Sequence, residues 1–327
     1  MNPTGTDEEE DRVHSVVVPL QLAGMRLDAA CAQLIPDYSR SRIRHWIDRG
    51  RVSVNGAAVT RAREPVREND RIELLAEAEE EASAVLPQNL ALNIVHADKS
   101  VVVINKPAGL TVHPGAGQKA GTLQNALLYH YPQTAAVPRS GLVHRLDKDT
   151  SGLMVAALTL NAHALLVRAM SGREVRREYD AVVQGTYISG GTIDLPIGRH
   201  LRDRLKQAVL ERGGRDAVTH YRIQERFTRH THLRVKLQTG RTHQIRVHFS
   251  HLKHPIVGDS LYGGGSARGA GMSAELRAAL QEFPRQALHA RELEFAHPVS
   301  ARSLSFSAEP PADIQQLLQT LRKLDKD

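Results

Sequence analysis

The order of apolar and polar positions near the N-terminus predicts two short helices followed by a hairpin. Leu27, Ala30, Cys31 and Leu34 recur at intervals of three and four residues, which is the spacing of one helix face. A second stripe lies within residues 39–49, between Ser39, a favourable N-cap residue, and Gly50, a favourable stop, and consists of Ile43, Trp46 and Ile47.

Short strands should follow the second helix. Residues 52–54 and 57–59 are apolar runs separated by Asn55-Gly56, a pair that favours the tight type I′ turn of a hairpin. Residues 71–75 predict one more strand of the same unit.

The long second part of the chain is rich in Val and Ile runs that Gly and Pro interrupt. Strands are predicted over residues 101–104, 153–157, 179–183, 221–223 and 233–237, and helices over 123–129, 161–170, 274–281 and 314–324. Because strands outnumber helices and the two do not alternate strictly, the pattern predicts an α+β domain with a mixed, mainly antiparallel sheet.

These patterns divide the chain into four parts. We expect an acidic disordered tail over residues 1–14, a small αβ domain over 15–76, an acidic alanine-rich linker over 77–88, and a large domain over 89–327. The glycine-rich stretch 263–271 is predicted to be a mobile loop.

Charge adds a prediction about the partner. The chain has 43 Lys and Arg against 36 Asp and Glu, a net charge of +7, although five acids crowd residues 7–11 and four crowd residues 77–81. The rest of the chain is therefore strongly basic. This favours a protein that binds a polyanion such as nucleic acid over a soluble protein that is merely basic.

The single cysteine and the lengths of the apolar runs exclude several further classes of protein. Cys31 alone excludes a disulfide framework and Cys-rich metal sites, and suits a reducing compartment. No run reaches the ~18 apolar residues of a membrane helix, and the acidic N-terminus has no signal pattern. We expect a cytoplasmic protein without a membrane partner.

The second predicted helix is basic and carries Arg40, Arg42 and Arg44. A solvated helix face is the ordinary interpretation, and contact with phosphates is the alternative. The segments around this helix, 26–28, 36–43 and 50–56, resemble the S4 RNA-binding module. The resemblance implies that these three arginines bind structured RNA.

The densest polar cluster is Gly141-Leu-Val-His-Arg-Leu-Asp-Lys-Asp-Thr-Ser-Gly152. A solvated turn is one interpretation. A Mg²⁺ phosphohydrolase is a second, since Asp147 and Asp149 form an Asp-x-Asp-x-Thr pattern and would point the same way in an extended stretch. Two features argue against the phosphohydrolase. His144 and Arg145 interrupt the strand that should precede the motif, and the chain lacks alternating βα units. The third is an RNA-modifying enzyme, in which neighbouring positive charge keeps a nucleophilic aspartate ionised.

The cluster closely resembles the catalytic motif of the RluA-type pseudouridine synthases. Further segments follow that family's order: 104–109 with 112–114, 177–181, 239–248 with 254–259, and 287–290 with 297–298. Together with the S4-like part, the resemblance covers nearly the whole chain.

The resemblance implies a role for each of four residues. Asp147 would be the catalytic nucleophile, Arg145 would displace and replace the flipped uridine, Tyr179 would stack on the uracil, and Arg246 would pair with Asp147. Without the resemblance, Tyr179 would be interpreted as a residue at the edge of the core, and Arg246 as a member of a surface ion pair. The implied reaction isomerises uridine and requires no cofactor.

The implied partner is 23S ribosomal RNA or a pre-ribosomal large-subunit particle, bound by a monomer. A non-catalytic RNA-binding or ribosome assembly factor stays open as an alternative. Four histidines, at positions 243, 248, 251 and 254, raise a zinc alternative, but zinc needs three or four convergent ligands and no cysteine is near. We therefore expect no metal.

Overall fold

The structure, a computed structural model, describes residues 12–36, 38, 40–76, 85–115, 118, 120–203, 205–263 and 272–326. It consists of two units, Met1–Ala84 and Val85–Asp327, which are described separately. Of the predicted tail, residues 12–14 lie in a strand and the rest lie outside the described residues. The strand forms because its backbone pairs with residues 71–76, a long-range partner that local charge does not reveal.

The first unit is a four-stranded antiparallel sheet with two helices. Its elements are β1 (Arg12–Val17), α1 (Leu27–Leu34), α2 (Arg40–Asp48), β2 (Val52–Val54), β3 (Ala57–Ala58) and β4 (Arg71–Ala76), with strand order β1-β4-β2-β3. The predicted helices and hairpin are confirmed, although Ser39 lies outside the described residues. Asn55 and Gly56 have φ of 54° and 82°, as the tight turn requires.

The two helices of the first unit are held by one apolar core. The stripes that predicted the helices, including Leu27, Cys31 and Ile43, are fully buried with Ile72 and Leu74 of β4, except that Leu34 is partly buried. Cys31 is therefore a core side chain, and burial raises the pKa of its thiol to about 12.

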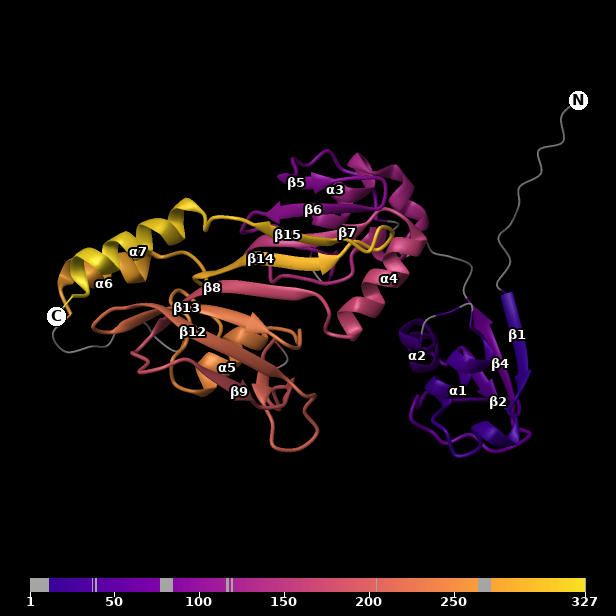
Figure 1. The fold of residues 1–327 in the computed structure, drawn as a ribbon. Coiled ribbons are helices and arrows are strands. Elements are labelled where there is room, and N and C mark those ends of the chain that lie inside the picture. Colours follow the sequence, from indigo (N-terminus) through magenta and orange to yellow (C-terminus); the bar gives the residue numbers. More distant parts are fainter. Residues whose placement is uncertain are drawn as a thin grey trace, which may run out of the picture. The chain divides into compact units, whose positions relative to one another are not determined.

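The second unit is built around one long sheet (Figure 1). Its strands are β5 (Ile94–Ala97), β6 (Val101–Lys106), β7 (Ser151–Ala157), β8 (Arg176–Gln184), β9 (Gly191–Asp194), β12 (Val218–Arg226), β13 (His230–Leu237), β14 (Leu288–Ala296) and β15 (Ser303–Ser307). The order is β5-β6-β7-β14-β8-β13-β12-β9, with β15 on β14. Only β14 and β7 pair in parallel among the described strands, so the predicted α+β class is confirmed.

A small ribbon and five helices complete this unit. Strands β10 (Ile197–Arg199) and β11 (Gln207–Val209) pair with each other, and the helices are α3 (Leu123–His130), α4 (Leu160–Ser171), α5 (Gln244–His251), α6 (Ala274–Glu282) and α7 (Ala312–Leu324). Figure 1 shows α6 and α7 together at one end of the sheet.

Alternation along β6 places apolar side chains on both faces of the sheet. Val102 and Ile104 enter a core shared with α3, α5, α6 and α7, whereas Val101 and Val103 enter a second core with α4. Every strand and helix predicted for the large domain is present. The sequence did not predict β14, because its apolar positions alternate irregularly with His289, charged residues and a bulge. Of the predicted mobile loop, residues 264–271 lie outside the described residues.

Candidate active site

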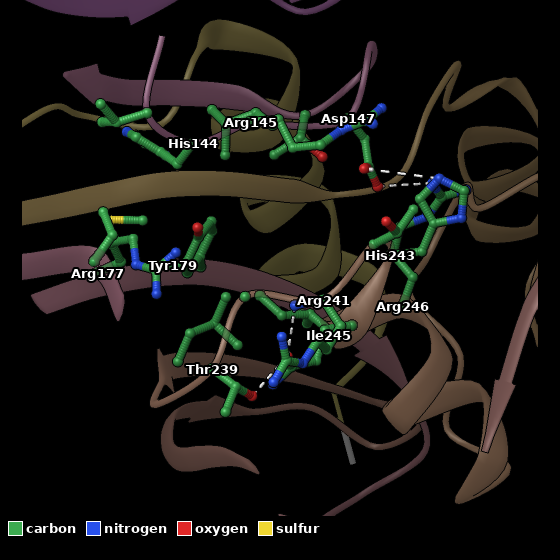
Figure 2. Close-up of a pocket in the computed structure, with 18 of the residues that line it drawn as sticks. His144, Arg145, Asp147, Arg177, Tyr179, Thr239, Arg241, His243, Ile245 and Arg246 are labelled. Atoms are coloured by element: carbon green, nitrogen blue, oxygen red, sulfur yellow. Dashed lines mark hydrogen bonds and ion pairs between the residues drawn. The ribbon is translucent and has the colours of Figure 1, made fainter. Parts of the chain in front are cut away.

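A cavity of about 450 Å³ opens where three segments of the sheet and α5 meet. The loop before β7 contributes residues 142–147 and Thr150, β8 contributes Arg177 and Tyr179, and the end of β13 with the turn after it contributes residues 237–243, which lead into α5. Its volume lies in the range of small-molecule and nucleotide sites. Figure 2 shows the labelled side chains.

Asp147 stands at one end of this cavity and is held by Arg246. Arg246 Nη1 donates to Asp147 Oδ2 at 2.8 Å, and the Asp147 side chain keeps 15% exposure. A second carboxylate, Asp259, accepts from Arg246 Nε at 2.7 Å and from Nη2 at 2.9 Å. Asp259 is itself fixed because it accepts the backbone N–H groups of Leu261 and Tyr262. Asp259 thus fixes the guanidinium of Arg246 while that guanidinium donates to Asp147.

His243 lies on the other oxygen of Asp147. Its Nε2 is 3.7 Å from Asp147 Oδ1, and its Nδ1 is 2.8 Å from the Tyr262 hydroxyl, which also accepts Gln207 N–H. The Tyr262 hydroxyl thus holds the His243 ring in place beside Asp147. Burial lowers the pKa of His243, which keeps the ring neutral. Its φ of 56° is left-handed, so the backbone holds a strained position there.

The loop that carries Asp147 is tied down at each following residue. Thr150 N–H donates to Asp147 O, so the segment is a turn and the extended Asp147–Asp149 arrangement of the sequence analysis is wrong. The carbonyl oxygen of Asp149 accepts from Arg285 Nη1, and Thr150 Oγ1 accepts from Gln286 Nε2. The loop is therefore rigid before any substrate binds.

Lys106 anchors the same loop from beneath. Its side chain is fully buried and donates to the carbonyl oxygens of Pro107, Leu110 and Lys148 at 2.8–2.9 Å. Burial lowers the pKa of Lys106 to about 7, but three acceptors use all three protons of an ammonium group, so the geometry is that of the charged form. A structural role for Lys106 before Pro107 agrees with its sequence, whereas the carbonyls that it binds could not be predicted from the sequence.

Tyr179 and Arg145 lie on the cavity as the motifs predicted they should. Tyr179 is 5% exposed, and burial raises the pKa of its hydroxyl, which keeps it protonated. Arg145 is exposed at the lining. The structure thus brings Asp147, Arg145, Tyr179 and Arg246 to one cavity, although their roles stay predictions.

The arginines of α2 belong to the other unit. Arg40 Nη2 lies 3.0 Å from Oδ2 of the buried Asp28, Arg42 lies over the Tyr38 and Trp46 rings, and Arg44 Nε is 3.9 Å from Asp48. Arg40 therefore also stabilises the fold, and RNA binding by the three stays a prediction.

The histidines of the zinc alternative have separate partners. His248 bonds to Thr219 and to the Leu195 carbonyl, and His254 to the Gln184 carbonyl. Within the described residues, no three His, Cys, Asp or Glu side chains are grouped to hold a metal ion.

Comparison with known proteins decides the family. Residues 100–251 match the family described as RNA pseudouridylate synthase, and residues 25–72 match the S4 domain. A relative from Xanthomonas campestris pv. campestris is 51% identical over 99% of this chain and 97% of its own, and one from Pseudomonas aeruginosa is 53% identical over 94% and 95%. The chain belongs to the RNA pseudouridylate synthase family.

Both relatives are named ribosomal large subunit pseudouridine synthase D. The likeness of the sequence to this subgroup of synthases, visible in residues 36–43 and 112–117, is thereby confirmed. Among solved structures, human RNA pseudouridylate synthase domain containing 4 is similar with a TM-score of 0.55 and 27% identity, covering 70% of this chain and 93% of that one. The phosphohydrolase alternative is therefore set aside.

The pseudouridine synthase site contains residues that the sequence analysis did not assign. His243 was considered only as a metal ligand, although its place three residues before Arg246 could have suggested a shared site; it is the N-cap of the helix that carries Arg246. Asp259 fell within the matching segment 254–259 but was given no role, and Tyr262 gave no signal, because both reach Arg246 only through the fold. No helix in the described ranges is long and apolar enough to cross a membrane.

Proposed function

We propose that the protein isomerises uridines of large-subunit ribosomal RNA to pseudouridine, with Asp147 as the nucleophile. The observation that carries the proposal is the Asp147–Arg246–Asp259 arrangement at the end of a cavity bordered by Tyr179. The RNA class follows from relatives at 51% and 53% identity that are named for the large ribosomal subunit.

The chemistry requires an ionised carboxylate and a base removed from its stack. Asp147 attacks the sugar C1′ while the C1′–N1 bond breaks. The freed uracil rotates against Tyr179, and its C5 then attacks C1′ and releases Asp147. The C5 proton is lost to solvent and N1 gains a proton, so atoms balance without oxidant or hydrolysis.

The other side chains serve this step. Arg246, held by Asp259, supplies a positive charge to the carboxylate and aims it, and His243 Nε2 lies 3.7 Å from its second oxygen. Arg145, exposed at the cavity, occupies the gap that the flipped uridine leaves. Arg40, Arg42 and Arg44 of the S4-type unit add affinity for structured RNA remote from the reaction.

Tritium release from ribosomal RNA labelled at uracil C5 tests the activity, because forming the C1′–C5 bond expels that hydrogen. We expect release with the wild type and none with Asp147→Asn. Pseudouridine-specific chemical modification and primer extension of the same RNA then map the modified uridines. No release by the wild type from naked RNA or from large-subunit particles would refute the proposal.

The binding-factor alternative makes a different prediction. If catalysis is the function, Asp147→Asn retains RNA affinity and loses product, and cells carrying it lack the pseudouridines. Complete restoration of ribosome assembly by Asp147→Asn in a deletion strain, with wild-type protein forming no pseudouridine, would favour the assembly factor.

The proposal includes a cytoplasmic monomer. The reduced Cys31 core and the ribosomal substrate support the compartment. Light scattering during size-exclusion chromatography checks the monomer, for which the expected mass is 36.1 kDa.

A further inference from the structure

Arg177 of β8 is a buried cation without an anionic partner. The residue is 8% exposed, lines the cavity, and has a buried Nε with no hydrogen-bond partner. Within the described parts of the chain, no carboxylate oxygen lies within 4.0 Å of its guanidinium. A buried charge left in this state is costly, and proteins ordinarily pair it.

The neighbouring arginines of the sheet are paired. Arg176 lies 2.6 Å from Glu178 and 3.6 Å from Glu294, and Arg234 lies 3.1 Å from Asp180. Alternation along β8 places Arg176 and Glu178 on one face and Arg177 on the other, the face of Tyr179 and the cavity. On this strand, the arginine without an ion-pair partner is therefore the one that faces the cavity.

The rest of the cavity does not supply the missing charge. Four further arginines line it without an ion pair to any described carboxylate: Arg139, Arg145, Arg173 and Arg241. The one acid in the lining, Asp147, is already bound by Arg246. His144 beside Arg177 is neutral, because burial first and the Arg177 charge second lower its pKa to about 3. An anion from outside would complete the cavity.

We propose that Arg177 binds a backbone phosphate of the RNA next to the flipped nucleotide. This proposal rests on the proposed function, because it assigns an RNA contact to the end of the cavity that lies away from Asp147. In the view of Figure 2, Tyr179 lies between Arg177 and Asp147, so Arg177 lies at the end of the cavity away from Asp147.

The chemistry of Arg177 favours phosphate over a uracil carbonyl. A neutral carbonyl would leave Arg177 without a counter-charge, whereas a phosphate supplies a negative charge and offers two oxygens to the planar guanidinium. Gly240 gives the group its room, because a Cβ there would lie 2.8 Å from Arg177 Nη1.

Arg177→Met and Arg177→Lys test the assignment, with Arg176→Met as the matched control on the opposite face of the same strand. We expect Arg177→Met to raise KM roughly 10-fold with kcat unchanged, since a phosphate contact contributes equally before and in the transition state. The slope of log affinity against log salt should fall by about 0.7 for Arg177→Met and stay unchanged for Arg176→Met. Arg177→Lys keeps the charge and should retain the slope.

A neutral methylphosphonate placed on either side of the mapped uridine identifies the phosphate. One of the two should weaken wild-type binding roughly 10-fold and leave Arg177→Met binding unchanged. Equal losses in both proteins, or no loss at either position in the wild type, would overturn the proposal.

The two proposals fail in different ways. If the wild type releases tritium but Arg177→Met matches Arg176→Met in KM and salt slope, only the phosphate site is refuted. If the wild type releases none, the reaction itself is refuted, and the salt slopes of RNA affinity for Arg177→Met and Arg176→Met still decide whether Arg177 holds a phosphate.

Discussion

Asp259→Asn separates the positioning of the nucleophile from the stability of the fold. Asp259 Oδ1 accepts two backbone N–H groups and Arg246 Nη2, and Oδ2 accepts Arg246 Nε at 2.7 Å. An asparagine can keep the Oδ1 contacts, but its amide would turn an N–H group toward the Nε–H of Arg246. The guanidinium then loses its rear anchor without losing its charge.

The expected losses follow from this geometry. Asp259 is fully buried, so breaking its pair with Arg246 should lower the free energy of unfolding by about 3–5 kcal/mol. Arg246 would no longer be fixed at 2.8 Å from Asp147, and a shift of this kind costs about 100-fold in rate. We therefore expect kcat to fall by about that factor, with RNA affinity nearly unchanged.

Single-turnover tritium release measures the rate, and urea denaturation measures the stability. Asp325→Asn is the matched control, because Asp325 is also a fully buried carboxylate, bound to His230 at 2.8 Å, but does not line the cavity. It should lower stability and leave the rate unchanged. A rate for Asp259→Asn within about threefold of the wild type, in a destabilised protein, would refute the positioning role.

Three further predictions concern stability and binding. The pKa of His144 is lowered to about 3, so the unfolded chain binds a proton that the folded chain does not, and stability falls as pH drops below 6.5. Between pH 7 and pH 4.5, the free energy of unfolding should fall by about 2–3 kcal/mol less in His144→Gln than in the wild type, as measured by denaturation at both pH values. An equal fall in the two proteins would contradict this prediction. Gly141→Ala should give no folded protein by circular dichroism, because its Cβ would collide with the Ala157 carbonyl at a φ of 82°. Arg44→Gln should lower RNA affinity in filter binding without shifting the melting temperature, whereas Arg40→Gln should lower both; equal melting losses would show that Arg44 is structural.

Local patterns predicted the secondary structure and the nucleophile because both depend on neighbours in the chain. The spacing of Ile43, Trp46 and Ile47 is enough to define one helix face, and Asn55-Gly56 is enough to define a turn. The Gly141–Gly152 motif is continuous, so Asp147 could be singled out before any fold was known. The parts that escaped prediction, such as β14 with its mixed polar positions, depend on strands paired on both sides.

What only the tertiary structure decided is which charges meet. Arg246 is 99 residues from Asp147 and 13 from Asp259, and no periodicity relates them; the order of the strands and the start of α5 bring them together. Adjacent Arg176 and Arg177 look alike in sequence, yet one is paired and the other faces the cavity. The reason is that the pleat assigns them to opposite faces, and only the packing on each face determines whether a charge finds a partner.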